Sequence, residues 1–236
     1  MDILSLYSFF VRFLNMLTQL SLAPIAVLII FIINFDKKTK EPFYLMFTAF
    51  FFGGFIVSIV LPICAMLENT YFAQRFSVLY RAYISSALLE ELFKAIFLYF
   101  LSSENRHFDR PFDFIIYSCL ISLGFASSEN LIYVYHPILG GVSTAVERAI
   151  FSVPGHFIFG ITMGYYYAGG KNAVFKKSNI LPAFAVSFLL HGIYNNIVIS
   201  AGVLYLLLFT PYMYFLWKNG LKKMLVMQIK SNVDIS

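Results

Sequence analysis

The sequence predicts an all-α protein that crosses a membrane several times. Hydrophobic residues make up 60% of the 236 positions and charged residues only 12%, well below the roughly 25% that is typical of soluble domains. Apolar stretches of about 20 residues recur along the chain, which is the length that a helix needs to cross a bilayer core. A transmembrane β-barrel would instead show alternating segments of about 10 residues, and the sequence has none.

Seven predicted spans account for the apolar stretches of a single domain that covers residues 1–236. They cover about residues 16–35, 43–67, 78–101, 111–134, 142–168, 180–200 and 202–217. Residues 3–15 are apolar but too short for another crossing, so we expect an interfacial lead-in to the first helix. A short turn near Ser200, Ala201 and Gly202 separates the last two spans. The start at Asp2 lacks a basic region and a small-residue cleavage site, so we expect the first helix to be retained.

The basic residues of the loops predict the orientation. The loops and tail on one side carry 12 Lys and Arg residues, and the other side carries three. The first set occupies 36–42, 102–110, 169–179 and the tail from Lys218, and the second is Arg12, Arg75 and Arg81. Because cytoplasmic loops are enriched in basic residues, we expect the amino terminus outside and the carboxyl terminus inside. The net charge of +5 then reflects topology and contact with anionic lipid rather than binding of nucleic acid.

The third span carries charged residues near the middle of the membrane, namely Glu90, Glu91 and Lys94. Charges in hydrocarbon are costly, so such residues usually face a bundle interior and serve a function. Lys94 follows Glu90 by four residues, and a simple ion pair would account for those two. Glu91 is rotated by about 100° and is not explained by that pair. Adjacent carboxylates in a medium of low dielectric suit general acid–base catalysis.

The fourth span carries Glu129 and Asn130 somewhat nearer the outer surface. Small residues recur at i+4 spacing over 118–126, which lets another helix approach closely. Glu129 has two interpretations that the sequence leaves open: an ion pair with Arg148 of the fifth span, or a direct catalytic role. Asn130 would satisfy backbone or carboxylate groups.

The fifth span carries His156 directly after Pro154 and Gly155. We expect this dipeptide to kink the helix and to free a backbone carbonyl. Gly160 and Gly164 follow His156 at i+4 spacing, so the face of the histidine is the closely packed one. His156 is therefore expected to point into the bundle.

The sixth span carries His191, with Asn195 on the same face at i+4 spacing. Asn195 would either fix the tautomer of the imidazole or bind the backbone of a substrate. Counting depth along each span places four residues on one mid-membrane plane that should open to the outside, where water could reach it: Glu90, Glu91, His156 and His191.

Several other hydrolytic sites are excluded. The chain has no H-E-x-x-H motif and no aspartate deep in a span. Ser143 follows Gly141 in a Gly-x-Ser pattern, but it lies at the outer end of its helix, far in depth from the histidines.

Cys64 and Cys119 differ in depth by roughly 20 Å, which is beyond the reach of a disulfide.

Taken in order, the motifs resemble those of the PrsW-type intramembrane protease family. They are E-E-x-x-K at Glu90, Glu91 and Lys94, F-x-x-x-E-N at Phe125, Glu129 and Asn130, Arg148 with H-x-x-x-G at His156 and Gly160, and H-x-x-x-N at His191 and Asn195. The match covers about residues 85–200, on four successive helices. The set is also distantly similar to the CAAX prenyl protease and bacteriocin-processing superfamily, in which E-E-x-x-x-R replaces E-E-x-x-K.

The resemblance implies proteolysis of a membrane-anchored protein, for example an anti-sigma factor, by a multi-pass protein of a bacterial or archaeal cell membrane. The expected catalytic residues are then Glu90, Glu91, His156 and His191. The expected supporting residues are Lys94, Glu129, Asn130, Arg148 and Asn195. A glutamate would take a proton from the water that attacks the peptide carbonyl and pass it to the leaving amine.

Two versions of this chemistry stay open. In one, His156 and His191 with Glu129 ligate a divalent metal such as zinc, because two histidines and one glutamate form a known catalytic zinc set. In the other, no metal is used and the histidines hold the water and the oxyanion.

Two functions other than proteolysis also stay open. Buried charges and broken helices are typical of proton- or ion-coupled transporters, although the sequence shows no inverted repeat. A non-catalytic scaffold that retains the fold is the third interpretation, and the complete set of polar positions argues against it.

Overall fold

A computed structural model describes residues 3–36, 41–70, 74–103, 105–172, 174–200 and 202–233. All regular structure in these ranges is helical, as predicted. The helices are α1 (Ile3–Phe35), α2 (Phe43–Glu68), α4 (Ser77–Leu79), η1 (Tyr80–Leu88), α5 (Leu89–Ser102), α6 (Pro111–Val134), α7 (Val142–Glu147), η2 (Arg148–Ser152), α8 (Val153–Tyr167), η3 (Gly170–Asn172), η4 (Lys177–Asn179), α9 (Ile180–Ser200), η5 (Gly202–Leu204) and α10 (Tyr205–Val233).

These helices correspond to the seven predicted spans. The third span is the continuous stretch α4–η1–α5, the fifth is α7–η2–α8, and the expected lead-in continues directly into α1. The last helix runs on to Val233, well beyond the predicted end at 217. Within the described residues, four helical segments are long and apolar enough to cross a membrane: Val11–Phe35, Phe43–Glu68, Pro111–Val134 and Lys177–Ser200. The count of seven crossings stays a prediction. Asp2, Ala201 and the three lysines of the 37–40 loop lie outside the described residues.

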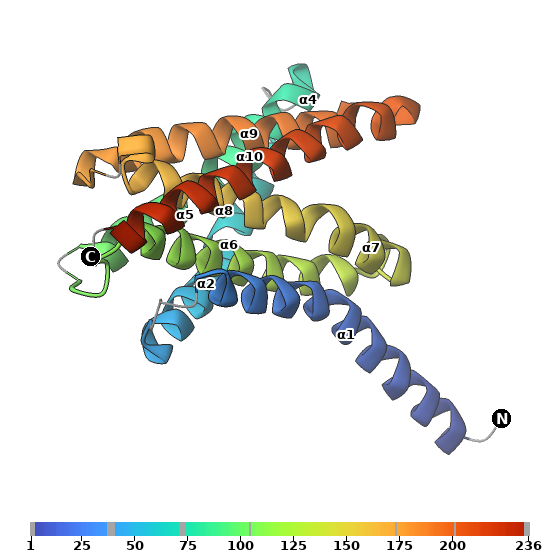
Figure 1. Ribbon diagram of the computed structural model, residues 1–236. Coiled ribbons are helices and arrows are strands. Elements are labelled where there is room, and N and C mark those ends of the chain that lie inside the picture. The colour runs from blue at the N-terminus through green and yellow to red at the C-terminus, as the bar shows by residue number, and fades with distance from the viewer. Residues whose placement is uncertain are drawn as a thin grey trace.

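Helix α6 is the centre of the bundle, and the other helices are arranged around it (Figure 1). It packs against α2, α8 and α1, and it is buried over most of its length. Helix α9 packs against α8 and η1, and α10 lies along α8 and α9. This arrangement brings α5, α6, α8 and α9, the four helices that carry the polar motifs, around a common interior.

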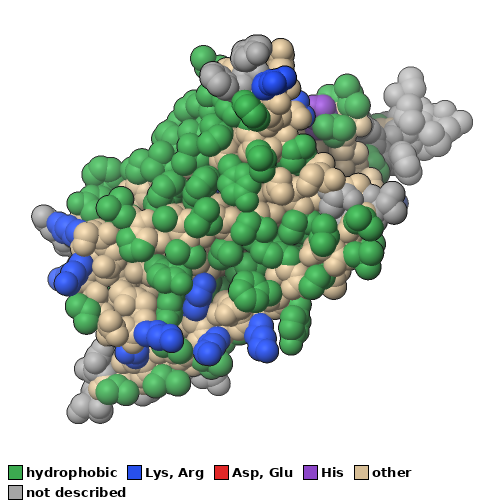
Figure 2. All heavy atoms as spheres, turned by 90° about the horizontal axis from the view of Figure 1, so that it is seen from above, with side chains coloured by type: hydrophobic (Ala, Val, Ile, Leu, Met, Phe, Trp, Pro, Cys, Tyr) green, Lys and Arg blue, Asp and Glu red, His purple; other side chains and the backbone are tan. Residues whose placement is uncertain are grey.

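The surface of the bundle is largely apolar (Figure 2). Most of the Lys and Arg side chains visible in this view lie toward one side of it. Helix α2 shows how the sequence produces such a surface, because phenylalanines recur every four residues on its outer face: Phe43, Phe47, Phe51 and Phe55. Its inner face carries smaller or aliphatic residues such as Ala49, Gly53 and Val57. On this helix the phenylalanines face the surroundings of the bundle, whereas other phenylalanines such as Phe125 and Phe157 lie in the core.

Small residues allow the central helices to touch at their backbones. A Cβ atom on Gly160 would lie 2.9 Å from Ser122 Oγ, so the small-residue stripe of α6 meets the glycine face of α8 as expected. A second contact was not expected from the sequence. A Cβ atom on Gly124 of α6 would lie 1.9 Å from the carbonyl oxygen of Phe50 in α2. No residue larger than glycine fits there without moving a helix.

Two π-helical segments precede the polar motifs of the third and fifth spans. Segment η1 ends two residues before Glu90, and η2 ends four residues before His156. Pro154 lies in the first turn of α8, where its missing N–H interrupts the regular hydrogen-bond ladder. The winding of the helix thus changes just before Pro154, and changes of this kind are common at functional sites. The kink and the freed carbonyl stay predictions.

A polar network joins the helix ends on the side predicted to be cytoplasmic. Arg110 lies 3.2 Å from Asp36 at the end of α1 and 3.2 Å from Asp113 in the first turn of α6. Tyr117 donates a hydrogen bond to Glu41, and burial raises the pKa of the Glu41 carboxyl above its usual value. These contacts hold the end of α1, Glu41 just before α2 and the start of α6 in one arrangement.

The backbone contact between α2 and α6 gives a first test. We expect Gly124→Ala to lower the stability of the folded protein by about 1–3 kcal/mol or more, because the added methyl group must push the helices apart. Gly220→Ala in α10 is the control, since its Cβ atom would meet Ile158 at an ordinary 3.6 Å. Unfolding of the detergent-solubilised variants in denaturant measures the effect. Equal stability of the two variants would contradict the close approach.

Candidate active site

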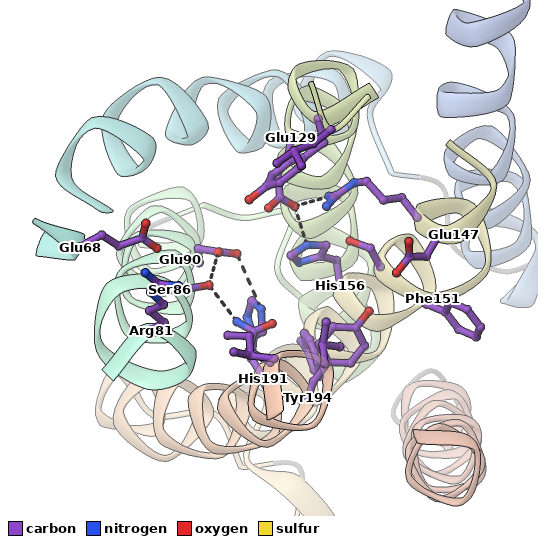
Figure 3. Close-up of a pocket in the computed structure, with 18 residues that line it drawn as sticks. Glu68, Arg81, Ser86, Glu90, Glu129, Glu147, Phe151, His156, His191 and Tyr194 are labelled. Carbon is purple, nitrogen blue, oxygen red and sulfur yellow. Dashed lines mark hydrogen bonds and ion pairs between the residues drawn. The ribbon is translucent and has the colours of Figure 1, made fainter. Parts of the chain in front are cut away.

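Polar residues from three helices meet in the interior of the bundle. Helix α5 contributes Glu90 and Glu91, α8 contributes His156, and α9 contributes His191. All four side chains are buried, and one potential ligand atom from each lies within 4.8 Å of the others. Figure 3 shows Glu90, His156 and His191 directed toward one another from separate helices. The structure thus brings together the residues that depth counting assigned to one plane.

The two neighbouring glutamates have different surroundings. Glu91 is fully buried, and its Oε1 lies 2.9 Å from both Lys94 Nζ and His191 Nδ1. Glu90 lines a cavity, and its Oε1 accepts a hydrogen bond of 2.8 Å from Ser86. Glu90 is therefore the carboxylate that a molecule in the cavity can reach, and Glu91 is held behind it.

Lys94 is a fully buried cation that serves both glutamates. Its Nζ lies 3.7 Å from Glu90 Oε2 and 2.9 Å from Glu91 Oε1, and it lies 4.1 Å from the ring centroid of Phe125. The pair expected at i+4 spacing is present, but the i+3 partner is closer. A simple Glu90–Lys94 pair therefore does not describe the site, because one ammonium group offsets two carboxylates.

Hydrogen bonds assign the proton positions on the two histidine rings. Nδ1 of His156 lies 3.3 Å from the Lys94 ammonium and must accept, so its proton resides on Nε2 and is donated to Glu129 Oε2 at 3.0 Å. Nδ1 of His191 donates to Glu91, so Nε2 of the neutral ring keeps its lone pair. That Nε2 lies 3.9 Å from Glu90 Oε2.

Glu129 forms an ion pair with Arg148, which is one of the two interpretations that the sequence left open. The guanidinium Nη2 lies 2.7 Å from Glu129 Oε2, and the Nε atom donates to Asn130 Oδ1 at 2.6 Å. Asn130 in turn donates to the backbone carbonyl of Ser21 in α1 at 3.1 Å. Asn130 therefore satisfies a backbone group, as expected, and the network ties α1, α6 and η2 together.

Glu129 lies beside the central cluster rather than within it. Its Oε2 already binds Arg148 and the far nitrogen of His156. A carboxylate in this position orients a histidine ring toward the opposite side. This arrangement differs from the ligand set of His156, His191 and Glu129 considered from the sequence. The carboxylates that share the central cluster with both histidines are Glu90 and Glu91 of α5. Glu129 of α6 binds only one of the two histidines, through the far nitrogen of His156.

Asn195 contacts neither histidine. Its Nδ2 donates to Ser86 Oγ at 2.8 Å and lies 3.5 Å from the carbonyl oxygen of Ala82. The structure therefore does not support a role for Asn195 in fixing the tautomer of His191, although both residues face the same interior. The interaction with Ser86 joins α9 to η1.

The cluster lies at the base of a cavity of about 540 Å³. The cavity extends to exposed residues at one end of the bundle, among them Glu68 at the end of α2 and Glu147 in α7. This end is opposite the loops 102–110 and 169–179, and it is the end predicted to face outside. Water can therefore reach Glu90 from that side.

The site combines the groups that peptide hydrolysis needs. Glu90 can accept a proton, and His191 Nε2 carries a lone pair 3.9 Å from Glu90 Oε2. Glu90 Oε2 and Glu91 Oε2 are buried and have no hydrogen-bond partner among the described residues. Two histidines and two carboxylates with unpartnered oxygens also suit a divalent cation such as zinc.

Sequence reasoning missed several residues of the cavity wall. Ser86 was not identified, although it precedes Glu90 by four residues and so shares its helix face. Arg81 and Tyr133 also line the cavity. Their contribution depends on the packing of separate helices, for which the sequence contains no local signal.

Comparison with known proteins identifies the family. Residues 41–217 match the family described as PrsW family intramembrane metalloprotease. The match begins with α2, well before the motif region at 85–200 that carried the resemblance. No solved structure matches the chain.

Curated relatives named Protease PrsW agree with this match over most of their length. The protein of Oceanobacillus iheyensis is 38% identical over 83% of this chain and 88% of its own. That of Geobacillus kaustophilus is 34% identical over 78% and 80%, and that of Bacillus subtilis is 32% identical over 80% and 84%. The chain is therefore a multi-pass membrane peptidase that belongs to the PrsW family of intramembrane metalloproteases.

Proposed function

We propose that this peptidase cleaves a membrane-anchored protein in the cavity that is lined by Glu90, His156 and His191. The observation that carries the proposal is the buried cluster of two glutamates and two histidines at the base of a water-accessible cavity. Family membership supports a protein substrate and does not favour the transporter that the sequence left open.

We further infer seven crossings, with the amino terminus outside and the carboxyl terminus in the cytoplasm. Seven continuous helical stretches support the count. The position of the cavity supports the orientation, because it opens at the end where α2 terminates with Glu68, away from the basic loops. Water would then reach the scissile bond from the outer side of the membrane.

In the mechanism that we infer, Glu90 is the general base. Its Oε2 removes a proton from a water molecule while the water oxygen bonds to the carbon of the peptide carbonyl. The proton then passes to the leaving amine as the C–N bond breaks, which returns Glu90 to its ionised state. The exposure of Glu90 to the cavity supports this role over Glu91, whose Oε1 is taken up by Lys94 and His191.

The surrounding residues hold the reacting groups in place. Glu91 orients the ring of His191, and Glu129 orients the ring of His156. Lys94 offsets the charge of the paired glutamates, so that both carboxylates can be retained in a medium of low dielectric.

The residues of the cluster fit the metal that the family description implies. The supporting observations are the unpartnered buried oxygen Glu91 Oε2 and the lone pair on His191 Nε2. Glu91, His156 and His191 would hold the ion, and Glu90 would stay free to act as the base. When bound, a zinc ion supplies Lewis-acid polarisation of the carbonyl and activation of water.

Substitution of the cluster tests the assignment of roles. We expect Glu90→Gln and His191→Ala each to reduce cleavage of a single-span substrate by at least about 100-fold, because each removes a reacting or ligating group. Glu91→Gln should reduce cleavage and also lower the unfolding midpoint, since Lys94 loses its nearest carboxylate. Reconstituted protein and gel-based cleavage measure activity.

The control for these variants is His107→Ala, because His107 lies outside the cavity, in the 102–110 loop. It should cleave at the wild-type rate. Full activity of both Glu90→Gln and His191→Ala would exclude this site.

Elemental analysis of active protein tests the metal. We expect about one equivalent of zinc in the wild type and in His107→Ala, and a much smaller amount in His156→Ala and His191→Ala with folding retained. Removal of the metal with a chelator should abolish cleavage, and zinc should restore it. Fully active protein without any metal would establish the metal-free mechanism.

A further inference from the structure

The hydroxyl group of Ser86 lies between Asn195 and Glu90. Asn195 Nδ2 donates to Ser86 Oγ at 2.8 Å, and Ser86 Oγ lies 2.8 Å from Glu90 Oε1. Three polar groups from α9, η1 and α5 thus form one chain of hydrogen bonds that ends on the carboxylate facing the cavity. Figure 3 shows Ser86 and Glu90 on the same side of the cavity, opposite His156.

The direction of each hydrogen bond in this chain is determined by its two ends. The amide nitrogen of Asn195 faces two acceptors, Ser86 Oγ and the carbonyl oxygen of Ala82, so the NH₂ group points toward them. Because Ser86 Oγ accepts from Asn195, its own proton is free to go to Glu90, and an ionised carboxylate can only accept. The hydroxyl is thereby oriented before any substrate binds.

Such a donor decides where the second oxygen of Glu90 points. With Oε1 held by Ser86, Oε2 remains without a hydrogen-bond partner, 3.9 Å from His191 Nε2 and 3.7 Å from Lys94 Nζ. If the donor is lost, the nearest group that can take up the carboxylate is Lys94, and a tighter ion pair would draw Glu90 away from the cavity.

We propose that Ser86 is the positioning residue of Glu90 and that Asn195 acts on the reaction through Ser86 rather than by contact with the substrate. This inference rests on the proposed role of Glu90 as the general base. Helix α9 would then contribute twice to the reaction. His191 belongs to the central cluster, and Asn195, one turn later, holds Ser86 in the orientation that positions Glu90.

Paired substitutions separate the hydroxyl group from the shape of the side chain. Threonine and valine have nearly the same shape, and only threonine carries a hydroxyl. We expect Ser86→Thr to keep most of the wild-type kcat, and Ser86→Val and Ser86→Ala to lose about 10- to 100-fold with KM unchanged, as is typical when the partner of an active-site group is removed. Equal kcat values for the threonine and valine variants would overturn the proposal.

Ser85→Ala is the matched control. Ser85 is the buried neighbour on η1, and its hydroxyl bonds to the carbonyl oxygen of Arg81 rather than to a carboxylate. It should keep the wild-type kcat, and all variants should keep the wild-type melting temperature. If Ser86→Val does not fold, Ser86→Ala takes its place in the comparison with Ser86→Thr.

A double-mutant cycle tests the role of Asn195. If Asn195 acts through Ser86, the variant that combines Ser86→Ala with Asn195→Ala should lose no more kcat than Ser86→Ala alone. If the kcat loss of the double variant equals the product of the losses of the two single variants, Asn195 acts separately, for example on the substrate. That result would overturn the proposal that Asn195 acts through Ser86.

An infrared measurement separates failure of this inference from failure of the proposed function. The infrared band of the Glu90 carboxylate is the one that is lost in Glu90→Gln, and this assignment requires no measurement of activity. We expect that band to shift in Ser86→Val and to keep its wild-type position in Ser86→Thr. A band that is unchanged in both variants would overturn the hydrogen bond, even if no substrate were cleaved.

Discussion

The need to keep two carboxylates in a medium of low dielectric is the constraint on which the rest of this structure depends. An uncompensated buried charge is costly, and removing one partner of a buried pair leaves the other exposed to that cost. Lys94 offsets part of the charge of Glu90 and Glu91, and His191 and Ser86 supply hydrogen bonds to their oxygens. The contacts that stabilise these buried charges also fix the orientation of the two carboxylates.

Close packing brings in the polar partners that come from other helices, because these partners must approach closely to form hydrogen bonds. Gly160 lets α8 approach α6 until Ser122 and the α6 backbone fill the space of a Cβ atom, and Gly124 does the same between α6 and α2. At these distances His156 reaches both Glu129 and Lys94. In lipid, helices associate through such contacts of small residues rather than through the hydrophobic effect.

In the proposed mechanism, the reacting groups face the cavity and the groups that hold them in place lie behind them. Glu90 and His191 line the cavity, whereas Glu91 and Lys94 are fully buried. On the other wall, the pairing of Glu129 with Arg148 keeps a carboxylate on the far nitrogen of the His156 ring. The residues behind the cavity wall therefore matter to the proposed reaction. Each reacting side chain has a polar partner, from the same or a neighbouring helix, that orients it.

The sequence by itself determined the helices and the polar residues that share a depth, because the apolar period and the rise per residue are local properties of a helix. It therefore predicted that Glu90, Glu91, His156 and His191 would meet. It could not predict that Lys94 lies closer to Glu91 than to Glu90, or that Asn195 binds Ser86. Those outcomes depend on the rotation and crossing of separate helices, which follow from contacts between residues distant in the chain, and only the tertiary structure decided them.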